Sequence, residues 1–172
     1  MKSTSPSDTV PFGHAYREAS LPGRAALVFS SWFGVGRLPK VPGTFGSLAA
    51  APAVWLMWVL GPVIGAIFLV VFLGLAVRAA GITEQILGQR DPGVIVVDEV
   101  AGMLVSLYLL PASWGFLVGG FFLFRLFDIT KPFPVRHLER IPGGAGVVLD
   151  DVMAGLYANL VLRVAASLWG LL

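Results

Sequence analysis

Charged residues are scarce in this chain, and cysteine is absent. Only 13% of its 172 residues are Asp, Glu, Lys or Arg, whereas 56% are hydrophobic. A soluble domain averages about 25% charged residues, so this chain has too little charge to cover a surface in water. The composition therefore predicts a protein that resides in a membrane. The absence of cysteine excludes disulfides, zinc–thiolate sites and cysteine nucleophiles.

Several catalytic and targeting signatures are also missing. The sequence has no Cys-x5-Arg loop, no Asp-x-Asp pair and no Ser-Gly-His motif, and its only histidines are His14 and His137. The Asp spacing of CDP-alcohol phosphotransferases is absent too. A net charge of +2 gives no indication of nucleic-acid binding. Residues 1–20 are polar and lack the apolar core of a cleavable signal, which predicts a flexible or interfacial segment over 1–24 and a membrane-embedded domain over 25–172.

Three uncharged or nearly uncharged stretches dominate the rest of the chain. They cover residues 41–77, 100–124 and 152–172, and only Arg163 interrupts the last one. A helix needs about 20 residues to cross the ~30 Å hydrocarbon core, so each stretch is long enough to enter a membrane. The shorter apolar run at 25–32 suits an interfacial helix instead.

Turn signals divide the first two stretches. Gly61-Pro62 interrupts the first and predicts a hairpin of helices over 44–60 and 63–79. The second is either one span or two short, re-entrant helices broken at 111–114. With no strong strand signal, the sequence predicts an all-α, polytopic membrane bundle of short helical hairpins and a C-terminal helix.

The topology of these hairpins decides whether the polar segments can share a site. If each hairpin returns to its starting side, the segments 37–47, 91–99, 125–140 and 143–151 lie together. The positive-inside rule then places their basic residues in the cytoplasm, where Arg136 and Arg140 simply mark that face of the membrane. Arg163 lies inside the last span and must reach the interface or find a partner.

Five carboxylates lie at the ends of the apolar stretches: the adjacent pairs Asp98–Glu99 and Asp150–Asp151, and Asp128. Carboxylates close to a bilayer are costly unless a cation compensates them. Mg²⁺ prefers oxygen ligands of this kind, so these residues are predicted to bind it. The alternative is that Asp98 and Asp150 are helix N-caps, although one carboxylate per helix would suffice for that role.

Cations and glycine-rich turns accompany these carboxylates. Lys131, near Asp128, is a candidate phosphate-binding residue, whereas Arg125 either binds phosphate or pairs with Asp128 on the same helix face. Gly43, Thr44 and Ser47 lie in a turn where Thr44 would cap the first helix and leave free N–H groups for a phosphate. The glycines at 143–146 would let the backbone approach a ligand.

With other nucleophiles excluded, water activated by a metal is the mechanism that remains. The predicted catalytic residues are Asp98, Asp128, Lys131 and Asp150, with Asp150 one candidate among several for the general base. A phosphotransferase acting on lipid headgroups and a transporter with a carboxylate-lined path are the alternatives. The transporter would place carboxylates within the spans, whereas here they cluster at the ends.

Four motifs follow one another in the chain: Gly36-Arg-Leu-Pro-Lys-Val-Pro-Gly-Thr-Phe-Gly-Ser-Leu48, Val97-Asp-Glu-Val-Ala-Gly-Met103, Phe124-Arg-Leu-Phe-Asp-Ile-Thr-Lys-Pro-Phe-Pro134 and Gly143-Gly-Ala-Gly-Val-Val-Leu-Asp-Asp-Val-Met-Ala-Gly155. In this order they resemble the motifs of the bacterial phosphatidylglycerophosphatase A family, and the likeness covers the chain from about Trp32 onward. The resemblance implies an Mg²⁺-dependent enzyme of the inner membrane that removes the terminal phosphate of phosphatidylglycerophosphate on the cytoplasmic side and yields phosphatidylglycerol. It leaves the oligomeric state open.

Overall fold

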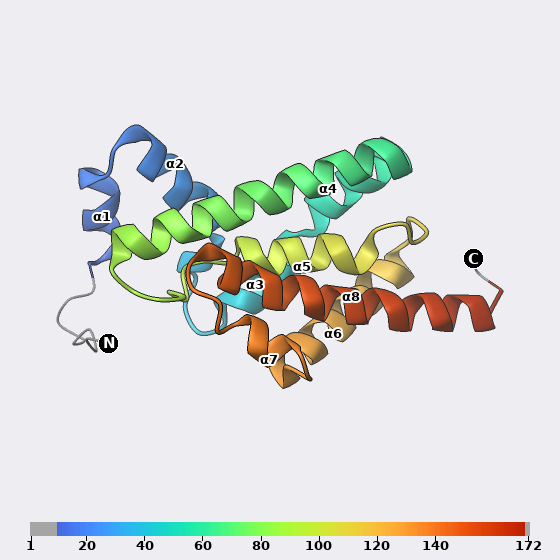
Figure 1. Cartoon of the computed structure of the whole chain (residues 1–172). Coiled ribbons are helices and arrows are strands. Elements are labelled where there is room, and N and C mark those ends of the chain that lie inside the picture. The colour runs from blue at the N-terminus through green and yellow to red at the C-terminus, as the bar shows by residue number, and fades with distance from the viewer. Residues whose placement is uncertain (1–9, 171–172) are drawn as a thin grey trace.

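The computed structural model describes residues 10–170, and this range is helical without a β-strand (Figure 1). The predicted all-α class is therefore confirmed. Residues 1–9 of the predicted N-terminal segment lie outside the described range. The elements are α1 (Phe12–Glu18), α2 (Leu21–Ser30), the 3-10 turn η2 (Val35–Arg37), α3 (Pro42–Ala49), α4 (Ala51–Leu87), α5 (Val97–Leu107), α6 (Trp114–Thr130), α7 (Val135–Leu138) and α8 (Gly144–Leu168).

The first apolar stretch folds into the predicted helical hairpin. The chain turns within α4 at Gly61, which adopts φ 74° and ψ 180°, a conformation that glycine reaches without strain. The two arms then pack against each other, with Gly65 against the carbonyl of Met57. The second arm continues to Leu87 rather than to residue 79, because Ala80, Thr83 and Leu87 extend its buried face.

The second apolar stretch is two helices, as one of the two predictions proposed. α5 and α6 are joined by a turn over residues 108–113 and lie antiparallel, since Gly102 faces Phe124 and Gly120 faces Leu107. α5 has 11 residues and is therefore only about 16 Å long. It is too short to cross a ~30 Å hydrocarbon core, so residues 100–124 do not form a single span.

The tips of the two hairpins meet at one end of the molecule. The Tyr108 hydroxyl donates a hydrogen bond to the Pro62 carbonyl at 3.0 Å, and the rings of Trp55, Trp58 and Trp114 pack together nearby. Both apolar stretches therefore turn back toward the end of the molecule at which they begin. The predicted convergence of the polar segments at the opposite end follows from this arrangement.

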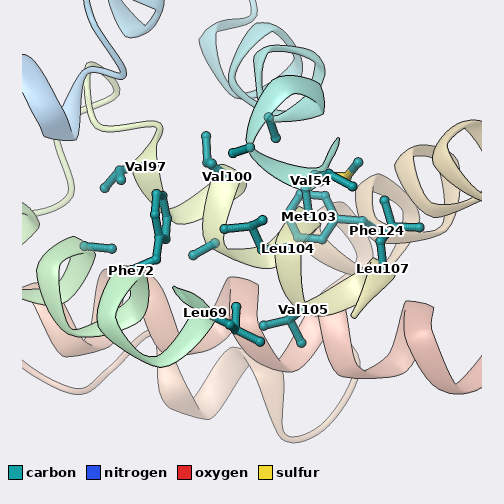
Figure 2. Close-up of a cluster of buried hydrophobic side chains, with 14 of the residues drawn as sticks. Val54, Leu69, Phe72, Val97, Val100, Met103, Leu104, Val105, Leu107 and Phe124 are labelled. Carbon is teal, nitrogen blue, oxygen red and sulfur yellow. The ribbon is translucent and has the colours of Figure 1, made fainter. Parts of the chain in front are cut away.

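α8 packs along α4, α5 and α6 and closes the core. Figure 2 shows Leu69, Phe72, Val100, Leu104 and Phe124 within the hydrophobic cluster that these helices share. The helix begins at Gly144, eight residues before the predicted start of the last apolar stretch, residue 152.

Arg163, which the sequence predicted must find a partner, is accommodated within the bundle. Its guanidinium donates to Asn159 Oδ1 at 2.7 Å and to the Tyr108 carbonyl at 3.1 Å. The hydrogen-bonded groups compensate the cost of this charge on an apolar helix.

Two helical stretches, Pro42–Leu87 and Gly144–Leu168, are long and apolar enough to cross a membrane. Large apolar side chains also point outward from the bundle, among them Val63, Ile67, Phe122 and Leu160. An apolar surface of this extent is unfavourable in water and normally marks a contact with lipid or protein.

Candidate active site

Four polar segments that are far apart in the sequence line one small cavity of about 170 Å³. Gly43 comes from the start of α3, Asp98 and Glu99 from the start of α5, and Asp128 and Lys131 from the end of α6. Asp150 and Asp151 come from the second turn of α8. All five predicted carboxylates therefore gather in one place, as the hairpin topology required.

The two acidic pairs have the same local geometry. Asp98 Oδ1 accepts a hydrogen bond from the Glu99 N–H at 3.0 Å, and Asp150 Oδ1 accepts one from the Asp151 N–H at 3.0 Å. Neither pair caps its helix, because Val96 and Gly143 occupy the N-cap positions. The N-cap alternative for Asp98 and Asp150 is therefore wrong.

Three carboxylates at the centre of the site have no cationic partner among the described residues. One oxygen from each of Asp98, Glu99 and Asp151 lies within 4.8 Å of the others. Glu99 Oε2 is buried and has no hydrogen-bond partner in the described part of the chain. Buried carboxylates repel one another at this distance, so the arrangement is unfavourable unless a cation lies among them. Three carboxylate oxygens suit a hard divalent cation.

The two other carboxylates form ion pairs. Arg125 Nη1 lies 2.6 Å from Asp128 Oδ2, so the ion pair that the sequence left open as the alternative to phosphate binding is present on one face of α6. Lys131 Nζ contacts Asp150 Oδ2 at 2.9 Å and Glu139 Oε2 at 3.2 Å. The sequence suggested Asp128 as its neighbour instead.

The backbone of Lys131 explains that difference. Lys131 ends α6 in a left-handed conformation with φ 43°, and its amine reaches α8 and Glu139. Burial lowers the pKa of Lys131, but its contacts with Asp150 and Glu139 outweigh burial and raise the pKa above its usual value. The amine therefore stays protonated at neutral pH.

The start of α3 lies against the acidic cluster. A Cβ at residue 43 would collide with the Glu99 carboxylate and would lie 3.1 Å from Arg125 Nη1, so only glycine fits. Thr44 does not cap the helix as predicted, because α3 begins at Pro42 with Val41 as its N-cap. Ser47 donates to the Gly43 carbonyl at 2.8 Å and stabilises the same helix. Of these three predicted residues, Gly43 alone lines the cavity.

The glycines of the fourth motif serve packing more than binding. Gly144 lies against the backbone of Val77 and Gly81, and Gly146 lies against the carbonyl of Ile141. Any side chain at residue 144 or 146 would push the start of α8 away from its neighbours. These glycines therefore position Asp150 and Asp151 rather than contact a ligand in the carboxylate cavity.

Two acidic residues near the site were missed by the sequence interpretation. Glu139, the residue directly after α7, forms an ion pair with Lys131. Asp91 lines the cavity, and its burial raises the pKa of its carboxyl. Both lie in the polar segments that were expected to converge, but no spacing rule marks either as a partner of this site.

The model of the family described as Phosphatidylglycerophosphatase A matches residues 28–166. This range is most of the chain, so the chain belongs to that family, and its class is therefore that of a phosphatase.

Curated relatives support the same assignment. The chain is 37% identical to Phosphatidylglycerophosphatase A of Escherichia coli over 141 residues, which are 81% of this chain and 82% of the relative. It is 40% identical to Phosphatidylglycerophosphatase A of Haemophilus influenzae over 133 residues, or 76% and 82%. A Bacteroides thetaiotaomicron protein with the provisional name phosphatidylinositol-3-phosphatase is 35% identical over 152 residues, or 81% and 92%. No solved structure matches the chain.

Proposed function

We propose that this protein is an Mg²⁺-dependent phosphatase that hydrolyses the terminal phosphate of phosphatidylglycerophosphate and yields phosphatidylglycerol for phospholipid biosynthesis. The observation that carries the proposal is the cluster of Asp98, Glu99 and Asp151, with a buried Glu99 oxygen that lacks a partner among the described residues. The names of the Escherichia coli and Haemophilus influenzae relatives support the substrate.

The donor set of the cluster fits Mg²⁺. Asp98, Glu99 and Asp151 would hold the ion, with Asp128 and Asp150 completing the acidic shell around it. Bound there, Mg²⁺ would supply positive charge to the phosphoryl oxygens and lower the pKa of a coordinated water.

The remaining side chains have roles that follow from their contacts. Lys131 would neutralise charge that develops on the phosphoryl group, because its amine stays protonated and is held by two carboxylates. Arg125 lies beside Gly43 at the start of α3, so its guanidinium and the N–H groups there would contact the same group. Asp150, oriented by Lys131 and the Asp151 N–H, is the candidate base for the proton of the attacking water.

The outer surface supports a site at the cytoplasmic face of a membrane. Apolar side chains of α4, α6 and α8 would face lipid, and the tryptophans at the hairpin tips would lie deeper in the bilayer or at its far interface. Lys131 lies with the carboxylates at the opposite end, and Arg90, Arg136 and Arg140 line a neighbouring cavity there, whereas Arg163 binds the Tyr108 carbonyl near the tips. The lipid tails would stay in the bilayer while the headgroup reaches the cavity.

The test is phosphate release from phosphatidylglycerophosphate by purified protein, with Mg²⁺ or with EDTA, beside Asp151→Asn and the control Glu18→Gln. Glu18 lies on α1 and contacts only His14 among the described charged groups. Release that requires Mg²⁺, survives in the control and is lost in Asp151→Asn is the expected result. Absence of release from folded wild-type protein under every condition would refute the proposal.

One relative justifies a second substrate in the same assay. The Bacteroides thetaiotaomicron protein is named for phosphatidylinositol-3-phosphate chemistry, so that lipid should be compared at equal concentration. A higher kcat/KM for phosphatidylglycerophosphate is expected. A higher kcat/KM for phosphatidylinositol-3-phosphate would retain the assignment as a phosphatase but would change the proposed substrate.

A further inference from the structure

A second, larger cavity of about 490 Å³ adjoins the carboxylate cavity. Arg90, Arg136 and Arg140 line it together with Asp91 and Glu139. The two cavities share Asp91 and Val147 in their walls, so they are neighbours. Lys131 also bridges the two cavities, because its amine contacts Asp150 in the carboxylate cavity and Glu139 in the larger cavity.

The guanidinium groups of this cavity have no carboxylate within ion-pair distance among the described residues, although Asp91 lies in the same wall. Arg90 Nη2 donates to the carbonyls of Glu139 and Ile141, and none of the three arginines forms an ion pair within residues 10–170. Of the two carboxylates in the wall, Glu139 already pairs with Lys131. The positive-inside rule accounts for basic residues on this face of the protein, but it does not require three of them to line one cavity.

The order of residues along α8 shows on which side of the reacting centre this cavity lies. Gly146 and Val147 line it, Asp150 and Asp151 follow about one helical turn later, and the apolar part of α8 comes after them. The arginines are therefore on the side of the carboxylates that faces away from the apolar bundle. Lipid tails lie on the other side, so a group that leaves toward the arginines is small and water-soluble.

We propose that Arg90, Arg136 and Arg140 form a phosphate-binding subsite that receives inorganic phosphate after hydrolysis. The inference rests on the proposed function. Arginine suits the role because its planar guanidinium donates paired hydrogen bonds to phosphate oxygens. The same chemistry would bind the phosphodiester of the lipid headgroup, which is the second source that the test distinguishes.

The test compares the single variant Arg140→Gln and the double variant Arg136→Gln/Arg140→Gln with the control Arg17→Gln, which removes one charge on α1 and so matches the single variant. Binding of inorganic phosphate is measured by calorimetry at constant ionic strength, and inhibition by phosphate is measured during hydrolysis. Loss of a charge-assisted hydrogen bond should raise both the Kd and the Ki by about tenfold in the double variant. The control should keep the wild-type values.

Two further outcomes decide the source of the ligand and the fate of the proposal. A higher KM for phosphatidylglycerophosphate but not for phosphatidic acid, with unchanged phosphate binding, would retain the subsite and assign it to the headgroup phosphodiester. Unchanged Kd, Ki and KM in variants with wild-type Tm would overturn it. Calorimetry does not depend on turnover, so failure of the proposed activity would be seen separately.

Discussion

The carboxylates of this site differ in whether a basic side chain lies within ion-pair distance of them. Asp128 and Asp150 each contact a basic side chain, whereas Asp98, Glu99 and Asp151 have none among the described residues. The adjacent acidic pairs could be recognised from the sequence as candidate metal ligands. Which of these carboxylates pair with cations could not be predicted from the sequence, because the direction of the Lys131 side chain depends on its left-handed backbone and on α8 lying beside it.

Glu99→Gln should separate metal binding from folding. In wild-type protein, saturating Mg²⁺ should raise the Tm, since a ligand at 100 times its Kd stabilises the native state by about 2.7 kcal/mol. The variant should lose this shift and at least about 100-fold in kcat. In EDTA its Tm should equal or exceed that of wild type, because a buried unpaired charge has been removed. A Tm that falls sharply in EDTA would mean that Glu99 is structural.

Lys131→Gln should reduce kcat by about 10²-fold to 10³-fold, because a cation beside the phosphoryl group would be lost. Glu139→Gln leaves the contact between Lys131 and Asp150 in place, so the loss of kcat in this variant should be much smaller.

Because the pKa of Lys131 is raised, the charge of its amine persists from acidic pH up to its usual pKa of about 10.4 and is lost only at higher pH. Rate profiles of wild type and Glu139→Gln between pH 6 and about 9.5 should therefore show no loss of activity from this lysine. Equal losses of kcat in Lys131→Gln and Glu139→Gln would contradict a direct role of Lys131.

Elements meet closely in this protein where glycines allow it. A Cβ at Gly155 would collide with the carbonyl of Gly102, and one at Gly102 would collide with the ring of Phe124. α5 and α8 therefore approach backbone to backbone, which is a common way for apolar helices to pack. This contact sets the distance between the acidic pairs, since Asp98 lies one turn before Gly102 and Asp151 one turn before Gly155.

Gly155→Ala should lower stability by about 1–3 kcal/mol through overpacking and should also weaken Mg²⁺ binding, because α5 and α8 move apart. Gly74→Ala is the matched control, since its Cβ would meet nothing within 4 Å on α4. The control should be neutral or stabilising by up to about 1 kcal/mol from helix propensity. Thermal unfolding in detergent with and without Mg²⁺ measures both effects. Similar behaviour of the two variants would show that the close approach is not required.

At the scale of the whole molecule, two hairpins and a long helix place every polar segment at one end. The tips of the hairpins lie together at the other end, where Tyr108 reaches Pro62. A hairpin arm as short as α5 reaches only about half of a ~30 Å hydrocarbon core. α8 is about 37 Å long and is one of the two stretches long enough to cross.

The absence of cysteine makes the topology directly measurable. Gln89→Cys lies on the exposed loop after α4 and Ser167→Cys on the exposed last turn of α8. If the site faces the cytoplasm and α8 crosses, an impermeant thiol reagent should label Cys at 89 in inside-out vesicles and Cys at 167 in right-side-out vesicles. Labelling of both from the same side would show that α8 does not cross.

The sequence by itself determined the helical class, the hairpin turn at Gly61-Pro62 and five of the acidic residues in the site, because these depend on composition, turn chemistry and local spacing. Tertiary structure alone decided which carboxylates lack partners, that Lys131 joins Asp150 and Glu139, and that Arg90, Arg136 and Arg140 share a cavity. Side-chain contacts between segments more than 50 residues apart follow from how the helices pack, and no local pattern encodes that packing.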